Sequence, residues 1–232
     1  MPDKWRSGLW LIVILLLAAC QQAELPPAEP QPTPQLLTLA YPPALRWLQP
    51  AFNTCALEKP QLTVLVVEAE ADPDVSLYWG EPDEIAGEVI LLGEDGLVLI
   101  ANPASQAISL TLAEVRQLFS GDALAWPDGA PLTVYALPAG HAVQNALESA
   151  LGSPVPRSVN IQIAPSLEAM QQYVADDPTA LGVLPQSWLN EQFKALDWET
   201  DTRQPVLASF TGARAEAFVR CLQSTVVEKL GE

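Results

Sequence analysis

Three cysteines have the chemistry that is easiest to anticipate, because a thiol can be acylated, oxidised or buried as a small apolar side chain. They are Cys20, Cys55 and Cys221. The first of them ends an uninterrupted apolar run, Leu9–Ala19, which follows Lys4 and Arg6. This run is much shorter than the roughly 20 residues that a membrane-spanning helix needs. A basic head and a short apolar run before small residues are typical of a secretory signal, so we expect residues 1–19 to be removed on export.

The end of this segment reads Leu17-Ala18-Ala19-Cys20. It resembles the bacterial lipobox, in which the cysteine thiol is acylated and becomes the first residue of the mature chain. The resemblance implies an extracytoplasmic protein held at a bacterial membrane by lipid on Cys20, since each buried methylene contributes about 0.8 kcal/mol. An ordinary signal peptide with an incidental cysteine is the alternative.

Residues 20–35 form a proline-rich segment. Its prolines alternate with Gln, Ala and Glu, so the segment cannot bury enough apolar surface to fold by itself. Proline favours an extended and semi-rigid chain. We therefore expect a linker that holds a folded domain away from the bilayer.

Cys55 and Cys221 remain as a pair in an oxidising compartment, where disulfides persist. Each lies on the apolar face of an expected helix, so both thiols are expected to be buried. A Cys55–Cys221 disulfide is favoured because exported chains usually form disulfides between all cysteines when an even number of them is left without another role. Two unpaired core cysteines are the alternative.

The composition argues against nucleic-acid binding and against catalysis. A net charge of −17 repels nucleic acid and other polyanions. His141 is the only histidine, and we find neither a metal-ligand cluster nor a nucleophile placed with a base. We therefore expect no enzyme activity, no cofactor and no metal, although Glu81, Asp83 and Glu84 leave a cation site conceivable.

The elements that must position these residues alternate between short apolar strands and amphipathic helices, which predicts an α/β fold. The expected strands are 36–41, 62–67, 75–79, 89–92, 97–101, 132–137, 159–163, 181–184 and 205–209, with a turn at 93–96. The expected helices with both ends assigned are 43–55, which Pro50 interrupts, 141–151 and 213–230. A further helix is expected to begin at the Thr111/Glu114 capping box and to end at Gly121. Another is expected to be capped by Ser166, and a short one to lie near Trp188.

Three segments in the middle of the chain carry a family resemblance: 96–103, 110–121 with the Trp126 beyond it, and 173–185. They resemble the crossing strand, the following helix and the return strand of phosphate-binding-protein-like solute receptors, which belong to the type 2 periplasmic binding protein superfamily. The resemblance implies two α/β lobes joined by two crossing strands, with a ligand between them. Lobe one would comprise residues 36–101 and 190–232, which include both Cys55 and Cys221, and lobe two residues 102–189.

The same resemblance implies three ligand-binding loops. Their candidate residues here are Tyr41, Trp79, Gly80, Ala139, Gly140 and His141. In the receptors these loops offer hydroxyls and backbone amides to phosphate, but Pro42 and Pro43 have no amide proton and the third loop has lost both hydroxyls. Glu81 and Asp83 would oppose an anion, so we expect a ligand other than phosphate.

The interval between Val67 and Val75 is shorter than in the family, which places a helix there. A parallel crossover usually needs a dozen residues or more. We therefore expect a trimmed first lobe that lacks a parallel crossover at this point and whose strand order can differ.

Two functions follow from the resemblance. The first is a receptor that binds a small solute and delivers it to an ABC permease, with aromatic side chains facing an apolar or cationic ligand. The second is a domain whose binding site has decayed and which acts as an extracytoplasmic interaction or sensory module.

Overall fold

The computed structural model describes residues 34–230 except 60, 124, 157, 158 and 199. The expected signal segment, Cys20 and nearly all of the expected linker lie outside these residues. None of the helices in the described part combines the length and apolar character needed to cross a bilayer.

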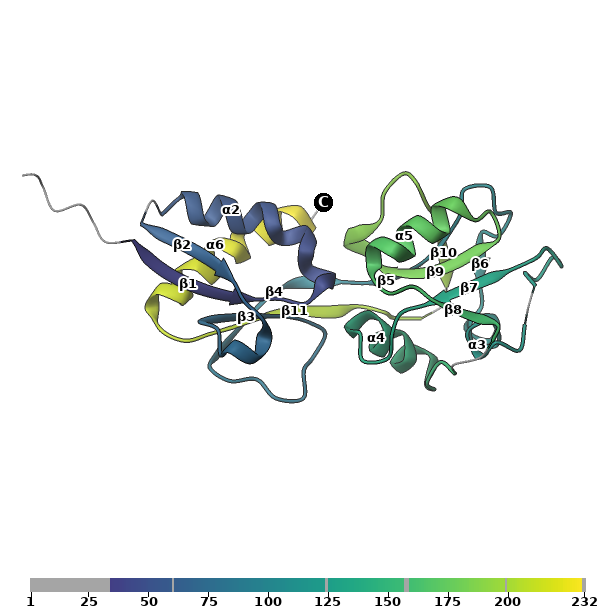
Figure 1. The fold of residues 1–232 in the computed structure, drawn as a ribbon, viewed down its shortest axis with the longest axis horizontal. Coiled ribbons are helices and arrows are strands. Elements are labelled where there is room, and N and C mark those ends of the chain that lie inside the picture. The colour runs from purple at the N-terminus through teal and green to yellow at the C-terminus, as the bar shows by residue number, and fades with distance from the viewer. Residues whose placement is uncertain (1–33, 60, 124, 157–158, 199, 231–232) are drawn as a thin grey trace, which may run out of the picture. The chain divides into compact units, whose positions relative to one another are not determined.

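The first of two sheets has the strand order β2-β1-β3-β11-β4 (Figure 1). Its strands are β1 (Gln35–Ala40), β2 (Leu62–Val66), β3 (Val75–Trp79), β4 (Glu88–Asp95) and β11 (Gln204–Phe210). Both β2 and β3 run parallel to β1, whereas β11 runs antiparallel to β3 and β4. The helices that pack with this sheet are the 3-10 helix η1 (Pro43–Leu48), α2 (Gln49–Leu57) and α6 (Ala213–Leu230).

The second sheet has the order β6-β10-β5-β9-β7-β8. Its strands are β5 (Leu97–Ala101), β6 (Ser109–Leu110), β7 (Thr133–Ala136), β8 (Ile161–Ile163), β9 (Ala180–Pro185) and β10 (Lys194–Trp198). Every residue of β9 is buried, as expected for a strand covered on both faces. The accompanying helices are α3 (Leu112–Ser120), α4 (Ala142–Leu151), α5 (Leu167–Asp176) and the 3-10 helix η3 (Gln186–Trp188).

The chain passes between the sheets twice, at Gly96 and again between Trp198 and Gln204. Hydrogen bonds tie the two passages together. The Leu97 amide donates to the carbonyl oxygen of Thr202 at 3.3 Å, and the Thr202 hydroxyl donates to the Leu97 carbonyl at 3.1 Å. Both β5 and β10 belong to the second sheet, whereas the expected ranges assign them to lobe one. The two strands pair with each other, so the chain crosses back to the first sheet only after β10.

The short connection from β2 to β3 corrects the expectation about the crossover. Both strands run parallel to β1, so the connection is a parallel crossover of only residues 67–74, with the 3-10 helix η2 (Ala69–Ala71) where the family has a helix. It can be short because the two strands are staggered: Val66 at the end of β2 and Val75 at the start of β3 both pair with Leu39. The chain therefore does not travel back along the sheet.

The expected turn at 93–96 is also corrected. Residues 93–95 continue β4 and pair with Gln204–Val206 of β11, and Gly96 alone connects β4 to β5. A β-bulge between Val206 and Leu207 accommodates the extra length. The apparent turn residues therefore lie in a strand that ends at the passage between sheets.

Local signals set the helix boundaries as expected. The Thr111 hydroxyl accepts from the Glu114 amide at 3.3 Å, and the Glu114 carboxylate accepts from the Thr111 amide at 2.7 Å. Gly121 ends α3 with a left-handed backbone, for which φ is 78°. The first helical region is divided between Leu48 and Gln49, so that Pro50 lies in the first turn of α2.

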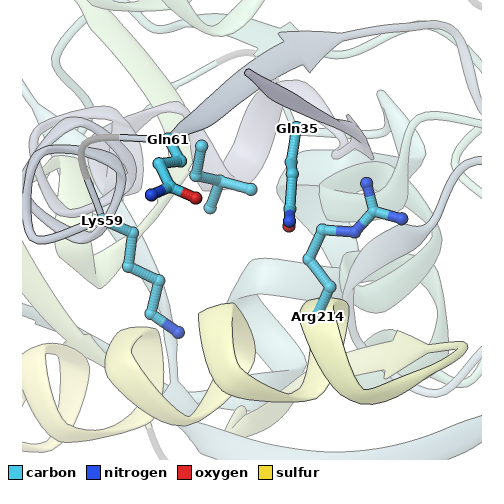
Figure 2. Close-up of a pocket in the computed structure, with 5 residues that line it drawn as sticks. Gln35, Lys59, Gln61 and Arg214 are labelled. Carbon is cyan, nitrogen blue, oxygen red and sulfur yellow. The ribbon is translucent and has the colours of Figure 1, made fainter. Parts of the chain in front are cut away.

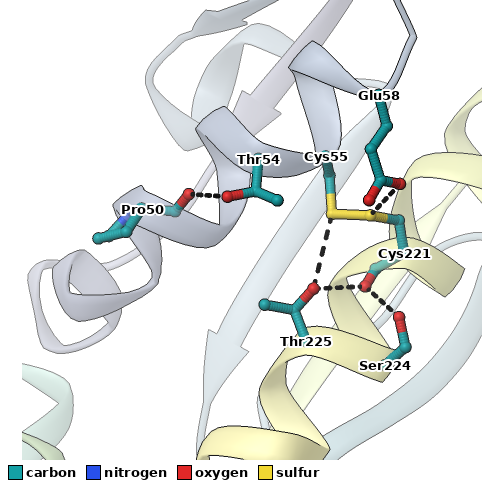
Figure 3. Close-up of a disulfide and its surroundings, with 7 residues drawn as sticks. All are labelled: Pro50, Thr54, Cys55, Glu58, Cys221, Ser224 and Thr225. Carbon is teal, nitrogen blue, oxygen red and sulfur yellow. Dashed lines mark hydrogen bonds between the residues drawn. A yellow bond between two sulfur atoms is a disulfide. The ribbon is translucent and has the colours of Figure 1, made fainter.

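A disulfide joins Cys55 of α2 to Cys221 of α6, with a Cα–Cα distance of 5.8 Å (Figure 3). Both helices pack with the first sheet, and Phe52 and Phe218 are buried beside the bridge positions. The carboxylate of Glu58 lies 3.4 Å from the Cys221 sulfur. The bridge thus ties the beginning of the described chain to its end.

Candidate functional site

A groove of about 1140 Å³ lies where the carboxyl ends of β1 and β3 face α4. Open α/β sheets bind ligands beyond the carboxyl ends of their parallel strands. The first sheet and its loops contribute Tyr41, Ser76, Tyr78, Trp79 and Gly80, and residues 203–205 complete one wall. The groove is therefore bounded by elements of both sheets, close to the passages between them.

The wall from α4 is one helical face. Ala142, Asn145, Ala146 and Ser149 line the groove at positions i, i+3, i+4 and i+7. The two alanines leave space, and the exposed Asn145 and Ser149 present an amide and a hydroxyl. This face can accept and donate hydrogen bonds to a polar solute without contributing a charge.

The aromatic side chains of the groove differ in how much of each is exposed to a ligand. Tyr41 is half-buried, and its ring lies 5.0 Å from that of Phe52 between centroids. Trp79 is only 5 % exposed, and its indole Nε1 donates to Asp95 Oδ2 at 3.0 Å. Trp79 therefore forms part of the wall, while its N–H is already used within the protein.

The groove has an excess of negative charge. Glu68, Glu81 and Asp83 line it, against a single cation, Arg203. The Asp201 carboxylate accepts from Arg203 at 2.9 Å, and the same guanidinium lies 3.6 Å from Glu94. Hydrogen bonds from Arg203 lower the pKa of Asp201 to about 2, so both members of this exposed pair stay ionised and Arg203 has an acidic partner within the protein. An anion entering the groove meets no unengaged lining cation among the described residues.

The buried Asp95 connects the groove to the 3-10 helix η3. It is 3 % exposed and accepts from Trp79 Nε1, from the Ser187 amide at 3.1 Å and from the Ser187 hydroxyl at 2.7 Å. Burial raises the pKa of this carboxyl, and the hydrogen bonds from Ser187 and Trp79 oppose that rise. Asp95 thus couples a groove residue of β3 to η3.

No protein-family profile and no curated protein sequence matches this chain. Solved structures do match it. A candidate phosphate ABC transporter substrate-binding protein from Clostridium perfringens, with bound phosphate, aligns with 84% of this chain and 97% of its own at 15% identity and a TM-score of 0.72. An ABC-type phosphate transport receptor from Vibrio cholerae aligns with 85% and 98% at 15% identity and a TM-score of 0.65.

The chain has the type 2 periplasmic-binding-protein fold. The two-lobed α/β architecture expected from the sequence is thereby confirmed. The same fold occurs in a regulatory domain of OxyR2 from Vibrio vulnificus, which aligns with 85% of this chain and 98% of its own at 19% identity and a TM-score of 0.60. Structural neighbours therefore include both transport receptors and regulatory domains.

In this type 2 periplasmic-binding-protein fold, the start of α4 is where a helix N-terminus could offer amides to an anion. His141 occupies the N-cap, and its Nδ1 accepts from the Val143 amide at 3.3 Å. Burial lowers the pKa of His141, against the opposing charge of Glu168, so the ring is neutral at pH 7. One donor that an anion would use is therefore already satisfied by a neutral side chain.

The residues expected at the site fall into two groups. Tyr41, Trp79, Gly80 and Gly140 line the groove, whereas Ala139 and His141 lie beside it at the start of α4. Asn145 and Ser149 were not among the expected residues, although their signal is present as polar positions along a helix with an apolar opposite face. Asp95 was not among them either, because burial of a carboxylate by residues far apart in sequence has no local signature.

Two further contacts join the halves of this fold on another side. The guanidinium of Arg46 in η1 contacts the carboxylate of Glu168 in α5, and Trp188 Nε1 of η3 donates to the Ala44 carbonyl at 2.8 Å. No group of three or more His, Cys, Asp or Glu residues suited to a metal occurs in the described ranges. The arrangement offers a place to bind a solute, with shape and polarity as its selecting features.

Proposed function

We propose that this chain is an extracytoplasmic solute-binding lipoprotein whose groove accepts a neutral or cationic small solute in preference to phosphate. The groove between the two sheets carries the proposal. Its volume of about 1140 Å³ slightly exceeds the usual range for small-molecule sites, roughly 300–1,000 Å³, so a small solute fits within it. The type 2 periplasmic-binding-protein fold supports a binding role, because its neighbours are binding proteins and regulatory domains.

The ligand class follows from the charges and donors of the lining. The lining has three carboxylates and one cation, and that cation is already paired. The electrostatic interaction with the lining therefore favours binding of a cation and opposes binding of an anion. Tyr41 and Tyr78 also line the groove, and aromatic rings attract ammonium groups. Asn145 and Ser149 supply orienting hydrogen bonds.

The location and the partner extend this proposal. Lipid on Cys20 would hold the domain at the membrane outside the cytoplasm, through the proline-rich linker. The transport receptors among the structural neighbours make an ABC permease the proposed recipient of the solute. Mass spectrometry of the mature protein tests the anchor: an unmodified Cys20, or a mature chain that begins elsewhere, contradicts it.

Binding is tested by tryptophan fluorescence of the full-length protein in detergent. The titrants are quaternary ammonium compounds, polyamines, neutral amino acids and inorganic phosphate. Asn145→Arg adds bulk and positive charge to the groove, and Asn53→Arg makes the same change on the exposed face of α2.

A saturable shift with a cationic or neutral solute, weakened at least tenfold by Asn145→Arg and within twofold of wild type in Asn53→Arg, supports the proposal. Saturable binding of phosphate with similar affinity contradicts the proposed selectivity.

The alternative function is an interaction or sensory module with a decayed site. Internal partners already engage the Trp79 indole, the Arg203 guanidinium and the Val143 amide, which leaves fewer donors for a ligand. The regulatory domain among the structural neighbours shows that this fold also serves outside transport receptors. Absence of any saturable response across the panel favours this alternative.

A further inference from the structure

A second pocket, shown in Figure 2, has a volume of about 270 Å³. It lies at the start of β1 and β2, whereas the groove lies at their ends. Gln35, Lys59, Gln61, Leu62 and Arg214 line it. Gln35 and Leu62 are the first residues of their strands and pair with each other in the sheet, and Arg214 comes from the first turn of α6. Three segments far apart in sequence therefore converge on this pocket.

The lining of the second pocket is suited to an anion. Lys59 and Arg214 are cations, Gln35 and Gln61 each carry an amide that can donate, and none of the lining residues that the structure describes is acidic. Within the described ranges, neither cation belongs to an ion pair. Arg214 Nη1 donates to the Leu36 carbonyl at 2.7 Å, which holds the guanidinium at the pocket while leaving its other donors for a ligand.

Three acidic residues lie close to these cations in sequence or interact with them, but none of the three lines the pocket. Glu58 lies 3.4 Å from the Cys221 sulfur, and Glu216 is bonded to Arg220 at 2.8 Å. The carboxylate of Asp74 accepts from the Thr38 amide and hydroxyl, both at 2.8 Å, and these bonds, together with the charge of Arg214, lower its pKa. In a chain with 28 acidic residues and 11 basic ones, two cations without an acidic lining partner are an exception to the prevailing charge.

We propose that this pocket binds the phosphate of an anionic lipid headgroup in the membrane that carries the anchor. The inference rests on the proposed lipid attachment at Cys20. The proline-rich segment ends where the pocket begins, since Gln35 is the first residue of β1. The 14 residues between Cys20 and Gln35 can span up to about 40 Å when extended, so the tether permits docking.

Docking through this pocket orients the groove. β1 runs from the pocket at Gln35 to the groove at Ala40, a distance of about 17 Å at roughly 3.3 Å per residue. The acidic groove end is repelled by an anionic surface, whereas the pocket end is attracted. The docked domain therefore holds its groove toward the aqueous phase, and delivery to a permease requires release from the lipid.

The experiment measures acetylation of Lys59 by mass spectrometry on the full-length protein in two kinds of vesicle. One is phosphatidylcholine alone, and the other contains phosphatidylglycerol as well. The anchor inserts into both, so only headgroup charge differs. Lys194 on β10 is the internal reference, and Arg214→Gln is compared with Arg220→Gln, which removes one exposed cation from the same helix outside the pocket.

We expect Lys59 labelling to fall about fivefold on the anionic vesicles, on the scale that one cation contributes near a charged membrane. Protection should disappear in 0.5 M salt and in Arg214→Gln, but persist in Arg220→Gln. Equal labelling on both vesicles overturns the proposal, and so does protection that survives Arg214→Gln. Equal protection by inorganic phosphate without vesicles overturns the lipid assignment and identifies a free-anion site.

This test separates the two proposals. A failure of the anchor shows as protein that does not float with neutral vesicles, whereas a failure of the headgroup site shows as floating protein with unprotected Lys59. Neither result depends on a solute in the groove.

Discussion

Asp95 Oδ2 accepts a hydrogen bond from Trp79 Nε1 at 3.0 Å, and this bond joins the last residue of β4 to the wall of the groove. The same oxygen accepts from the Ser187 hydroxyl, and Oδ1 accepts from the Ser187 amide. Three donors from two different segments thus converge on one buried carboxyl group. Its substitution is therefore expected to affect both stability and the groove.

Asp95→Asn should lower the free energy of unfolding by about 1–3 kcal/mol at pH 7, because asparagine has one acceptor oxygen in place of two, so its NH2 group faces at least one of the Trp79 and Ser187 donors and leaves it unsatisfied. Urea unfolding followed by circular dichroism measures this change. Ser187→Ala removes a donor and leaves Trp79 paired, so it serves as the milder comparison. Equal stability of Asp95→Asn and wild type would show that these bonds contribute nothing.

The raised pKa of Asp95 predicts a pH trend. The folded chain takes up this proton at a higher pH than the unfolded chain, whose reference value is 3.8. Relative to Asp95→Asn, the wild-type protein should therefore gain stability as the pH falls from the folded pKa toward 3.8, and the difference should be constant above that window. Unfolding of both proteins across this range tests the sign, and a loss of relative stability on acidification contradicts it.

Reduction of Cys55–Cys221 should destabilise the fold. The bridge closes a loop with a sequence separation of 166, for which the chain-entropy model gives about 5 kcal/mol. Guanidinium unfolding with and without a reductant measures the loss, and a Cys55→Ser/Cys221→Ser variant should match the reduced protein. Two free thiols in the folded, exported protein would refute the pairing itself.

Gly87→Ala should be more damaging than an alanine at another left-handed glycine. At Gly87, φ is 84° and an added Cβ would lie 2.6 Å from the Phe210 carbonyl oxygen. Gly129 has a φ of 86° with nothing within 4 Å of an added Cβ, so Gly129→Ala isolates the backbone cost of about 1–2 kcal/mol. We expect Gly87→Ala to cost a further 1 kcal/mol or more, by roughly the scale of overpacking, and thermal unfolding of the pair to reveal the difference.

Thr111→Ala should cost about 0.5–2 kcal/mol, because the variant loses the side-chain half of the capping box. Hydrogen bonds from the Thr111 amide and hydroxyl lower the pKa of Glu114 below its ordinary value of 4.5. The ionised Glu114 therefore contributes to folding stability above pH 4.5, and this contribution is lost as the pH falls through the pKa of the folded state. NMR titration should find this pKa higher in Thr111→Ala and nearly unchanged in Thr111→Ser. A Glu114 pKa that is the same in all three proteins would argue against the box.

Local signals predict much of this fold because they act within a few residues. Apolar runs place β3 at Val75–Trp79, and the final helix occupies the expected 213–230. Thr111, Gly121 and Pro50 set boundaries through backbone geometry and capping, which the sequence states directly. These features need no knowledge of the rest of the chain.

The features that were missed depend on register and tertiary pairing. The short crossover is possible only because β2 and β3 meet β1 at Leu39, and a sequence does not state that stagger. β6 has two residues, and β10 has five that include the charged Lys194 and Asp197, so neither carries a strong strand signal. The groove face of α4 was readable as a polar stripe, whereas the burial of Asp95 required three segments to be assembled.

The bonds between Leu97 and Thr202 mean that the polypeptide leaves the first sheet and re-enters it at practically the same point. Everything from residue 97 to residue 198 is therefore a contiguous insert whose two ends are adjacent. Such an insert can be exchanged between homologous scaffolds, or replaced by a short bridging peptide, without cutting any strand of the first sheet. Chimaeras spliced at Gly96 and Arg203 would accordingly allow one half of the groove to be varied while the other, held by the Cys55–Cys221 bridge, stays fixed.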